Sequence, residues 1–564
     1  MVVDKFINEL EIILKTLHDT NITDKYRKYK DRNYTNNTNR IISYDTLDSI
    51  IGNNTPQITN NLRNQSKNYN RIVKRLKHKL RHTNTIIQRT DKSKIFHLGR
   101  QEDYLKKSDE HMEITGAYKC LDKHDPLPEL IQRTNSYLLK LRLKHLITQK
   151  QYESLVVKTE EVDLAHLYYL PKVHKQDTPL RPIVAGMKHP TIKISRMLDE
   201  LLRPLFNKMA ATTTVTSGTE VLDKLEKWSV KNLRQTTTFC TLDVCNLYTM
   251  IPQIDGVLSF KKMLDKLNLK HVSGLSTETI IKLSRYVLQN NYFTYNSRYY
   301  HQIRGGAMGS PLTLTMANCY MYFYELDIIK QITNSGGLYM RYIDDIFIVI
   351  NWPTRHLHKQ INTWNNFDVN IKLNPHVDQS VNFLDITIEN KNGQLFTKVY
   401  HKPSHEPYFL PYNSIHPLHI KKNIPFAMLL RSIKYCSTFE AYLDERETIR
   451  MALLLNKYPN NFIDNQFNRI FTKYNINTHL THENYTNERN KIINKPITKE
   501  DQLNTKYNQS MYIHFTYCTS MVNFPKKFNE LWKKYFEDSP INDINPILCT
   551  RNTNNLQLRL TYNR

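Results

Sequence analysis

The stretch LYMRYIDDIFIVI, residues 338–350, places two aspartates between two runs of apolar and β-branched residues. Runs of this length and composition are typical of β-strands, so the stretch predicts two strands joined by a turn at Ile343-Asp344-Asp345. An ionised carboxylate in an apolar setting is costly unless it is paired or bound to a metal ion. Two adjacent carboxylates are costlier still, because each raises the pKa of the other. The simplest relief for such a pair is a divalent cation.

A third carboxylate, Asp243, follows the run TTTFCTL at residues 236–242, which predicts another short strand. Phosphoryl-transfer enzymes use such sets, because two Mg²⁺ ions about 3.5–4 Å apart stabilise the attacking and the leaving oxygen together. Mg²⁺ also prefers carboxylate oxygens and substrate phosphates as ligands. We therefore predict that Asp243, Asp344 and Asp345 are catalytic and hold two Mg²⁺ ions, for which Mn²⁺ substitutes. A lone Asp-Asp pair is more often a surface turn, and here the apolar flanks argue against that.

The charge balance of the 564 residues is strongly basic, with 79 Lys and Arg against 53 Asp and Glu and a net charge of +26. Such an excess repels itself and indicates a polyanionic partner, nucleic acid first and an anionic membrane surface second. No run approaches the roughly 18 apolar residues of a membrane-spanning helix, so we expect no membrane anchor. Residues 1–17 carry three acidic side chains and predict an amphipathic helix rather than a secretory signal.

The seven cysteines include no CxxC pair, and their odd number and wide scatter favour a reducing intracellular compartment. A zinc site from His401, His405, His416 and His419 is a weak alternative, because no cysteine or fixed spacing supports it. The basic run RIVKRLKHKLRH at residues 71–82 indicates either a helix that contacts phosphates or a solvated helix face.

Predicted strands and helices mix along residues 236–402. VNFLDITIE at 381–389 and FTKVYHK at 396–402 predict two further strands, and residues 275–290 and 311–331 predict helices. Elements mixed in this order indicate an α+β fold in which helices cover one face of a sheet.

Several of these features together resemble a known family. Tyr342-Ile343-Asp344-Asp345 resembles the catalytic hairpin of reverse transcriptases, and Asp243 with Tyr248 five residues on resembles their first catalytic strand. GGAMGSP at 305–311 is similar to their template- and nucleotide-positioning segment. PKVHK at 171–175 and LRPIV at 180–184 resemble their fingers.

The wording of the motifs narrows the resemblance to Penelope-like retroelements, which are relatives of telomerase. The matching motifs are LPKVHK at 170–175, RPIV at 181–184, LYTMIP at 247–252 and AMGSPL at 307–312. Past the hairpin the likeness continues in NFLD at 382–385, VYHKPS at 399–404, SIHPLH at 414–419 and KNIP at 422–425.

This resemblance implies an RNA-directed DNA polymerase, a nucleotidyltransferase that extends a DNA 3′-OH on an RNA template. Its implied partners are an RNA template, a DNA primer and deoxynucleoside triphosphates, and its implied place is the nucleus. It also implies a right-hand polymerase of fingers, palm and thumb, with an antiparallel-sheet palm and a helical N-terminal extension. The expected segments are a polar, partly disordered N-terminal extension (1–74), a helical N-terminal region of the polymerase (75–160), fingers (161–235), palm (236–400), thumb (401–485) and a basic linker-like region (486–564).

The same resemblance assigns residues to the nucleotide. Tyr248 is expected beneath the incoming sugar, where its ring would clash with a 2′-hydroxyl; the alternative is an ordinary core tyrosine. Arg181 is expected to grip the triphosphate, because a guanidinium matches phosphate oxygens bidentately; the alternative is a surface arginine. Lys172 and Lys175 are weaker candidates for the same task.

Further residues are assigned to the nucleic acid. Gly309, Ser310 and Pro311 are expected to begin a helix beside the template and nucleotide, because glycine permits close backbone approach and proline suits the first helical turn. In the thumb, five basic residues are expected to follow the primer–template backbone: Lys402, His416, His419, Lys421 and Lys422.

One departure from the family concerns a C-terminal GIY-YIG nuclease, which members that integrate autonomously usually carry. Its two signature tripeptides are absent, so we expect a truncated copy or a member of the nuclease-lacking branch. Two other functions stay open: a catalytically silent RNA-binding protein descended from such an element, and a metal-dependent nuclease that uses the same acids. The intact acids argue against the first, and the predicted fingers and sugar-contacting tyrosine argue against the second.

Overall fold

The structure is a computed structural model of the chain. It describes residues 2–3, 5–14, 16, 56–92, 95–173, 175–403, 406–414, 416–476, 478–494, 510–517, 521, 523–539 and 544–551. Much of the predicted N-terminal extension (17–55), parts of the predicted C-terminal region (495–509 and 552–564) and His405 lie outside the described residues. The chain divides into two compact units, one of residues 1–83, 407–433 and 443–561, the other of residues 84–406, 434–442 and 562–564.

The predicted catalytic strands form a four-stranded antiparallel sheet in the second unit, in the order β11-β12-β6-β13. Its strands are β6 (Thr238–Val244), β11 (Leu338–Tyr342), β12 (Asp345–Ile350) and β13 (Leu373–Asp378). The hairpin predicted from residues 338–350 and the strand predicted before Asp243 are confirmed. The apolar and β-branched composition of these runs suits strands that are buried on both faces.

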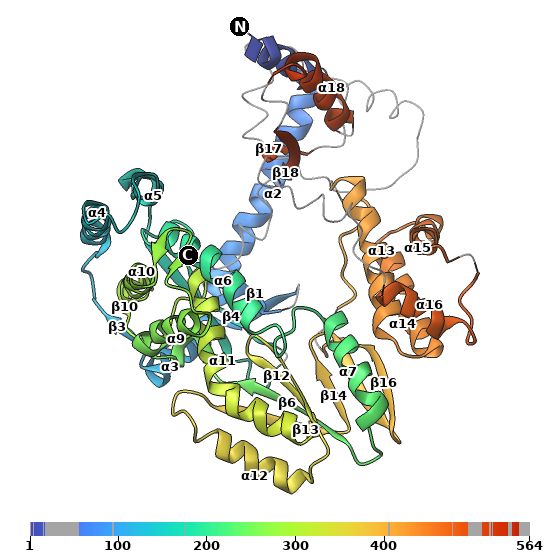
Figure 1. The fold of residues 1–564 in the computed structure, drawn as a ribbon. Coiled ribbons are helices and arrows are strands. Elements are labelled where there is room, and N and C mark those ends of the chain that lie inside the picture. The colour runs from blue at the N-terminus through green and yellow to red at the C-terminus, as the bar shows by residue number, and fades with distance from the viewer. Residues whose placement is uncertain are drawn as a thin grey trace. The chain divides into compact units, whose positions relative to one another are not determined.

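The two faces of this sheet differ, because alternate residues of a strand point to opposite sides. Leu242 pairs directly with Ile346, and both belong to the large core of the sheet. The sheet shares this core with helices α6 (Ile192–Met209), α9 (Gln253–Lys266), α10 (Thr277–Gln289), α11 (Pro311–Asn334) and α12 (Thr354–Trp364). The next pair, Asp243 with Asp345, therefore lies on the opposite face. Helices on one face were predicted, and Figure 1 shows α11 and α12 along these strands.

The other face of the sheet packs against a three-stranded sheet of β14 (Ser380–Phe383), β15 (Ile386–Lys391) and β16 (Gln394–Val399). The ring centroids of Phe347 and Phe383 lie 5.2 Å apart. The prediction of one strand over residues 381–389 was wrong, because Leu384 has φ = +54° and begins a two-residue turn between β14 and β15. Phe383 and Leu384 are adjacent apolar residues, so the alternation of apolar and polar residues shifts by one position at this turn.

A five-stranded sheet lies beside these elements, in the order β3-β10-β9-β4-β5. Its strands are β3 (Tyr118–Cys120), β4 (Ala165–Pro171), β5 (Leu180–Ala185), β9 (Tyr292–Tyr295) and β10 (Arg298–Gln302). Two hairpins add β1 (Thr85–Arg89) with β2 (Phe96–Arg100) and β7 (His271–Val272) with β8 (Leu275–Ser276). The predicted strand over 396–402 is confirmed in β16, and the predicted helices over 275–290 and 311–331 are confirmed in α10 and α11.

The helices of the second unit are α3 (Gln101–Thr115), α4 (Leu127–Leu143), α5 (Gln149–Leu155), α6 (Ile192–Met209), α7 (Gly218–Asn232), α8 (Leu247–Met250), α9 (Gln253–Lys266), α10 (Thr277–Gln289), α11 (Pro311–Asn334) and α12 (Thr354–Trp364), with a 3₁₀ turn at Thr159–Glu161. Helices and antiparallel sheets together confirm the α+β class.

The first unit carries α2 (Pro56–His82), α13 (Leu418–Tyr435), α14 (Phe439–Leu455), α15 (Asn460–Tyr474), α16 (Tyr485–Ile493), β17 (Ser510–Thr516), α18 (Phe524–Phe536) and β18 (Asn545–Arg551); residues 434–442 of α13 and α14 fall in the second unit. The helix predicted at the N-terminus is confirmed over residues 5–14. Its Phe6 is buried among Phe528, Trp532 and Phe536, and Glu9 pairs with Lys534 at 2.7 Å. Among the described residues, no helix is both long enough and apolar enough to cross a bilayer.

Candidate active site

The three predicted acids lie together where β6 and β11 end and β12 begins. Asp345 is the direct cross-strand partner of Asp243, so their carboxylates share the face opposite the helices. Asp344 lies in the turn of the hairpin, and its carbonyl oxygen accepts the N–H of Val244 at 3.2 Å. The sheet register thus brings together acids that lie far apart in the sequence.

The electrostatic setting of these acids is unfavourable for three negative charges. Burial raises the pKa of Asp345 to about 6, and the neighbouring charges of Asp344 and Asp243 add to the shift. Lys92 and Lys402 oppose it. A carboxyl whose ionised form is destabilised in this way is a group that a cation would stabilise.

The donor set fits divalent metal ions chemically. Carboxylate oxygens are the ligands that Mg²⁺ and Mn²⁺ prefer. As the side chains stand, no three His, Cys, Asp or Glu residues in the described part of the chain converge closely enough to enclose an ion. Instead the Lys175 ammonium lies 3.2 Å from Asp243 Oδ2, so a positive charge is held against one of the acids. The three acids therefore share one end of the sheet, while the Asp243 carboxylate contacts a lysine.

A cavity of about 980 Å³ opens in front of the acids. Five cationic side chains line it together with the three acids: Lys92, Lys172, Lys175, Arg181 and Lys402. Burial lowers the pKa of Lys172, and the positive charges of Arg181 and Lys175 lower it further. Positive groups facing acids across one cavity suit a ligand that carries phosphates and binds metal ions. The predicted triphosphate residues and the predicted metal ligands are thus brought to the same cavity.

The orientation of Arg181 is set by a residue that the sequence did not single out. Its Nε lies 3.1 Å from Oδ2 of Asp91, a nearly buried carboxylate two residues beyond the end of β1. The contact is an ion pair without hydrogen-bond geometry. The main chain of Asp91 is fixed in turn by its N–H, which donates to the Pro171 carbonyl at 2.9 Å. Asp91 and Lys92 carried no motif, and the packing of the β1–β2 hairpin against β4 places them here.

Tyr248 lines the same cavity, and the glycine loop that follows β10 fixes its main chain. The Gly306 N–H donates to the Tyr248 carbonyl at 2.9 Å. Gly305 has φ = +67°, and a Cβ there would lie 2.1 Å from the same carbonyl oxygen. Burial, followed by the charge of Asp344, raises the pKa of the Tyr248 phenol. The ring thus lies near the acids and also packs partly against the core.

Gly309, Ser310 and Pro311 lead into α11, as predicted. Pro311 begins the helix. Ser310 Oγ lies 2.7 Å from Ser195 Oγ. Gly309 has φ = +152°, and a Cβ there would lie 2.2 Å from the Val184 carbonyl oxygen. Close approach of two backbones explains the need for glycine at this position.

The five predicted nucleic-acid residues divide between the two units. Lys402 lines the cavity of the second unit. His416, His419, Lys421 and Lys422 belong to the first unit, where His419 and Lys422 are exposed and Lys421 donates to the Ser414 carbonyl at 2.6 Å.

Comparison with known proteins gives three findings. The family model described as the animal helix-turn-helix domain matches residues 408–468, which cover α13, α14 and the start of α15. No curated protein matches the chain. Solved structures that resemble it include telomerases and a viral polymerase.

Telomerase from Candida albicans in complex with the TWJ fragment of telomeric RNA is 12% identical, with a TM-score of 0.46, and the match covers 82% of this chain and 73% of that one. Apo telomerase from Candida tropicalis truncated from its C-terminal domain is 14% identical with a TM-score of 0.34; the match covers 43% of this chain and 56% of that one. The RNA-dependent RNA polymerase of BmCPV at the elongation state is 8% identical with a TM-score of 0.35, over 65% and 34% of the two chains. Each of these three TM-scores is below 0.5.

Proposed function

We propose that this chain is an RNA-directed DNA polymerase, the reverse transcriptase of a Penelope-like retroelement. The observation that carries the proposal is the direct pairing of Asp345 with Asp243 beside the Asp344 turn, in front of a cavity lined by Lys172 and Arg181. A surface turn that merely contained two aspartates would not face a third carboxylate and a set of cations. The retroelement origin and the nuclear location are supported by the wording of the sequence motifs.

The proposed metal ligands are Asp243, Asp344 and Asp345. Divalent ions held there would supply the positive charge that stabilises the attacking 3′-oxygen and the departing pyrophosphate. The protein's own part is to hold the three carboxylates at the end of a rigid sheet. Lys175 would exchange Asp243 for a phosphate group once metal ions and nucleotide bind, since its exposed ammonium can turn toward either.

The proposed nucleotide site comprises the cavity wall opposite the acids. Arg181, held by Asp91, presents its remaining N–H donors to a triphosphate, and Lys172 adds a second positive charge. Tyr248 places an aromatic ring where a ribose 2′-hydroxyl would lie, which selects deoxynucleotides by steric exclusion. The segment of Gly309, Ser310 and Pro311 would lie beside the template base.

The proposed partners are an RNA template and a DNA primer. The net charge of +26 supports a polyanionic partner. Four of the five residues of the proposed duplex-binding set fall inside the segment that matches the helix-turn-helix family model: His416, His419, Lys421 and Lys422.

A primer-extension assay on poly(rA)/oligo(dT) with dTTP and either Mg²⁺ or Mn²⁺ tests the proposal. We expect the primer to be extended with either ion and not with EDTA. Tight binding of the duplex without extension would favour the catalytically silent RNA-binding protein. Metal-dependent shortening of either strand would favour a nuclease instead.

A further inference from the structure

The turn between β11 and β12 contains a backbone conformation that isoleucine rarely adopts. Ile343 has φ = +58°, in the left-handed region, where a β-branched residue is a genuine outlier. Such a conformation persists only where the surroundings impose it, and such residues cluster at active sites. Because Asp344 follows directly, whatever holds Ile343 also sets the position of the Asp344 carboxylate.

The guanidinium of Arg341, two residues earlier, makes the contact that holds this turn. Its Nη1 donates to the Ile343 carbonyl oxygen at 3.0 Å and to Asn318 Oδ1 at 2.7 Å. Its Nη2 donates to the Asn318 carbonyl at 3.3 Å and to Glu325 Oε1 at 3.2 Å, and its Nε donates to Glu325 Oε2 at 2.6 Å. The side chains of Arg341 and Glu325 have no exposed surface. All five N–H donors of a guanidinium are thus matched by acceptors.

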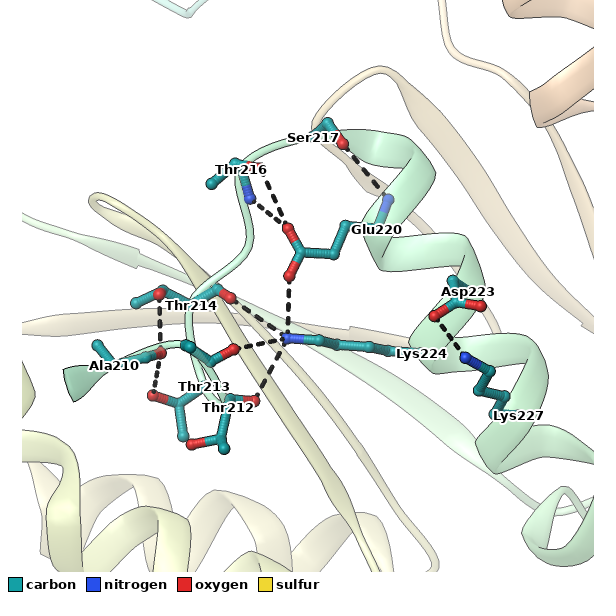
Figure 2. Close-up of polar contacts among 11 residues, drawn as sticks. Ala210, Thr212, Thr213, Thr214, Thr216, Ser217, Glu220, Asp223, Lys224 and Lys227 are labelled. Carbon is teal, nitrogen blue, oxygen red and sulfur yellow. Dashed lines mark hydrogen bonds and ion pairs between the residues drawn. The ribbon is translucent and has the colours of Figure 1, made fainter. Parts of the chain in front are cut away.

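The main chain of Arg341 is fixed as well. Its N–H donates to the Thr213 carbonyl and its carbonyl accepts the Val215 N–H, both at 2.9 Å. Residues 211–215 thus form a segment that covers the outer edge of the sheet at β11. Figure 2 shows how the segment is held from α7: the Lys224 ammonium points at its carbonyl oxygens and at Glu220. Lys224 donates to three carbonyls of the segment at 3.3–3.4 Å and pairs with Glu220 at 3.2 Å.

We propose that Arg341 is a positioning residue, whose guanidinium fixes the Ile343 turn and thereby aims the Asp344 carboxylate for metal binding. The inference rests on the proposed function, because it concerns the same metal site. An ion pair that served stability alone would join Arg341 to Glu325 without the contact to the turn. The arrangement instead spans from α11 to the turn, with the charge of Glu325 anchoring the far end.

Arg341→Lys tests the proposal, because lysine keeps the charge opposite Glu325 but is a compact donor that cannot reach the Ile343 carbonyl at the same time. The readout is Mn²⁺ affinity, followed by the electron paramagnetic resonance signal of the free ion, with a thermal melt of each variant. We expect the affinity for Mn²⁺ to fall about 10–100-fold, which is typical for loss of a residue that orients a metal ligand.

Tyr339→Phe is the matched control. Tyr339 is buried on the same strand, and its hydroxyl donates to Glu325 at 2.8 Å. Its removal disturbs the same buried network but leaves the bond from Arg341 to Ile343. We expect its Mn²⁺ affinity to stay within about twofold of wild type, as expected for a group that orients no ligand. Equal Mn²⁺ affinities in Arg341→Lys and Tyr339→Phe would overturn the proposal.

A second variant covers the case in which Arg341→Lys does not fold. Arg341→Gln combined with Glu325→Gln removes both charges together and so leaves no unpaired buried ion. It is expected to fold and to show the same loss of Mn²⁺ affinity, and wild-type affinity in this double variant would refute the inference. Wild-type protein that binds no Mn²⁺ at all would refute the proposed function, and this inference with it. If wild-type protein binds Mn²⁺ and Arg341→Lys binds it equally well, the inference is refuted and the proposed function is not.

Discussion

At the scale of single residues, the proposed metal site depends on local sequence and on strand register. It consists of Asp243, Asp344 and Asp345. Their apolar and β-branched flanks are visible in the sequence, so the strands could be predicted. Their meeting depends on the register between β6 and β12, which pairs Asp345 with Asp243. A slip of one residue would turn a whole strand to the other face. The sequence motifs implied this meeting by resemblance, whereas no local pattern specifies the register.

The same distinction explains the residues that sequence reasoning missed. Asp91 holds Arg181, and Arg341 holds the Ile343 turn, through contacts between segments that are distant in the chain. Both are charged residues in unremarkable local patterns. Their burial is the signal that marks them, and burial of a charge is known only once the fold is known.

Tyr248 as the residue that excludes ribonucleotides is tested by Tyr248→Ala. Removing the ring leaves room for a 2′-hydroxyl, so the kcat/KM for ribonucleotides is expected to rise relative to that for deoxynucleotides. Tyr248→Phe keeps the ring and is expected to keep the wild-type preference. The measurement is single-nucleotide incorporation with both sugar types, alongside a thermal melt.

The alternative for Tyr248 has a different signature. If the ring served only as core, Tyr248→Ala would cost about 3–5 kcal/mol of stability with no change in sugar preference. That result would remove Tyr248 from the proposed site.

At the scale of elements, periodicity and composition located the buried helices and strands well. α10 and α11 follow apolar helical patterns, and β11 and β12 follow apolar runs, so all four were predictable. The turn at Leu384 was missed because its conformation is not one that leucine signals. The contact between the glycine loop and the Tyr248 main chain could not be predicted from any local pattern. The three glycines in residues 305–309 indicated only that the backbone there has a special requirement.

The glycine loop is tested by Gly305→Ala against Gly116→Ala. Both glycines have positive φ, but a Cβ at Gly116 meets nothing within 4 Å, whereas one at Gly305 lies 2.1 Å from the Tyr248 carbonyl oxygen. Gly116→Ala is expected to cost about 1–2 kcal/mol, the left-handed penalty alone. Gly305→Ala adds a backbone clash and is expected to cost about 2–5 kcal/mol in total.

Chemical denaturation of the two glycine variants measures this difference. Gly305→Ala is also expected to lower nucleotide incorporation, because relief of the clash moves Tyr248. Equal stability losses in the two variants would mean that the loop does not press against the Tyr248 main chain.

At the scale of the whole molecule, the strongest sequence signal is the net charge of +26, which indicates nucleic acid without showing where it binds. Sequence reasoning placed Lys402 with four basic residues of residues 416–422 in one thumb. The structure separates them: Lys402 belongs to the unit that contains the three acids, and the other four basic residues belong to the other unit. The division follows from packing of distant segments, which charge patterning does not reveal.

The charge predicts a steep salt dependence. With roughly 6–10 phosphate contacts, the affinity for primer–template should fall about 10³–10⁵-fold between 50 and 200 mM salt. Lys422→Gln is expected to reduce the slope of log K against log salt by about 1, as for loss of one phosphate contact. Lys227→Gln is the control, because Lys227 is exposed but already pairs with Asp223. Fluorescence anisotropy across a salt series measures the primer–template affinity of wild type and of both variants. An affinity of wild type that does not change with salt would mean that the positive charge serves another partner.

The most direct test of the central claim is nucleotide incorporation by Asp344→Asn, measured together with primer–template affinity. Asparagine keeps the size of the side chain but removes the charge that a metal ion needs. Asp378→Asn is the matched control, because Asp378 is exposed at the end of β13 in the same sheet. Asp344→Asn is expected to abolish incorporation while binding the duplex nearly as well as wild type, and Asp378→Asn is expected to retain full activity. Wild-type incorporation by Asp344→Asn would contradict the proposed metal-dependent mechanism.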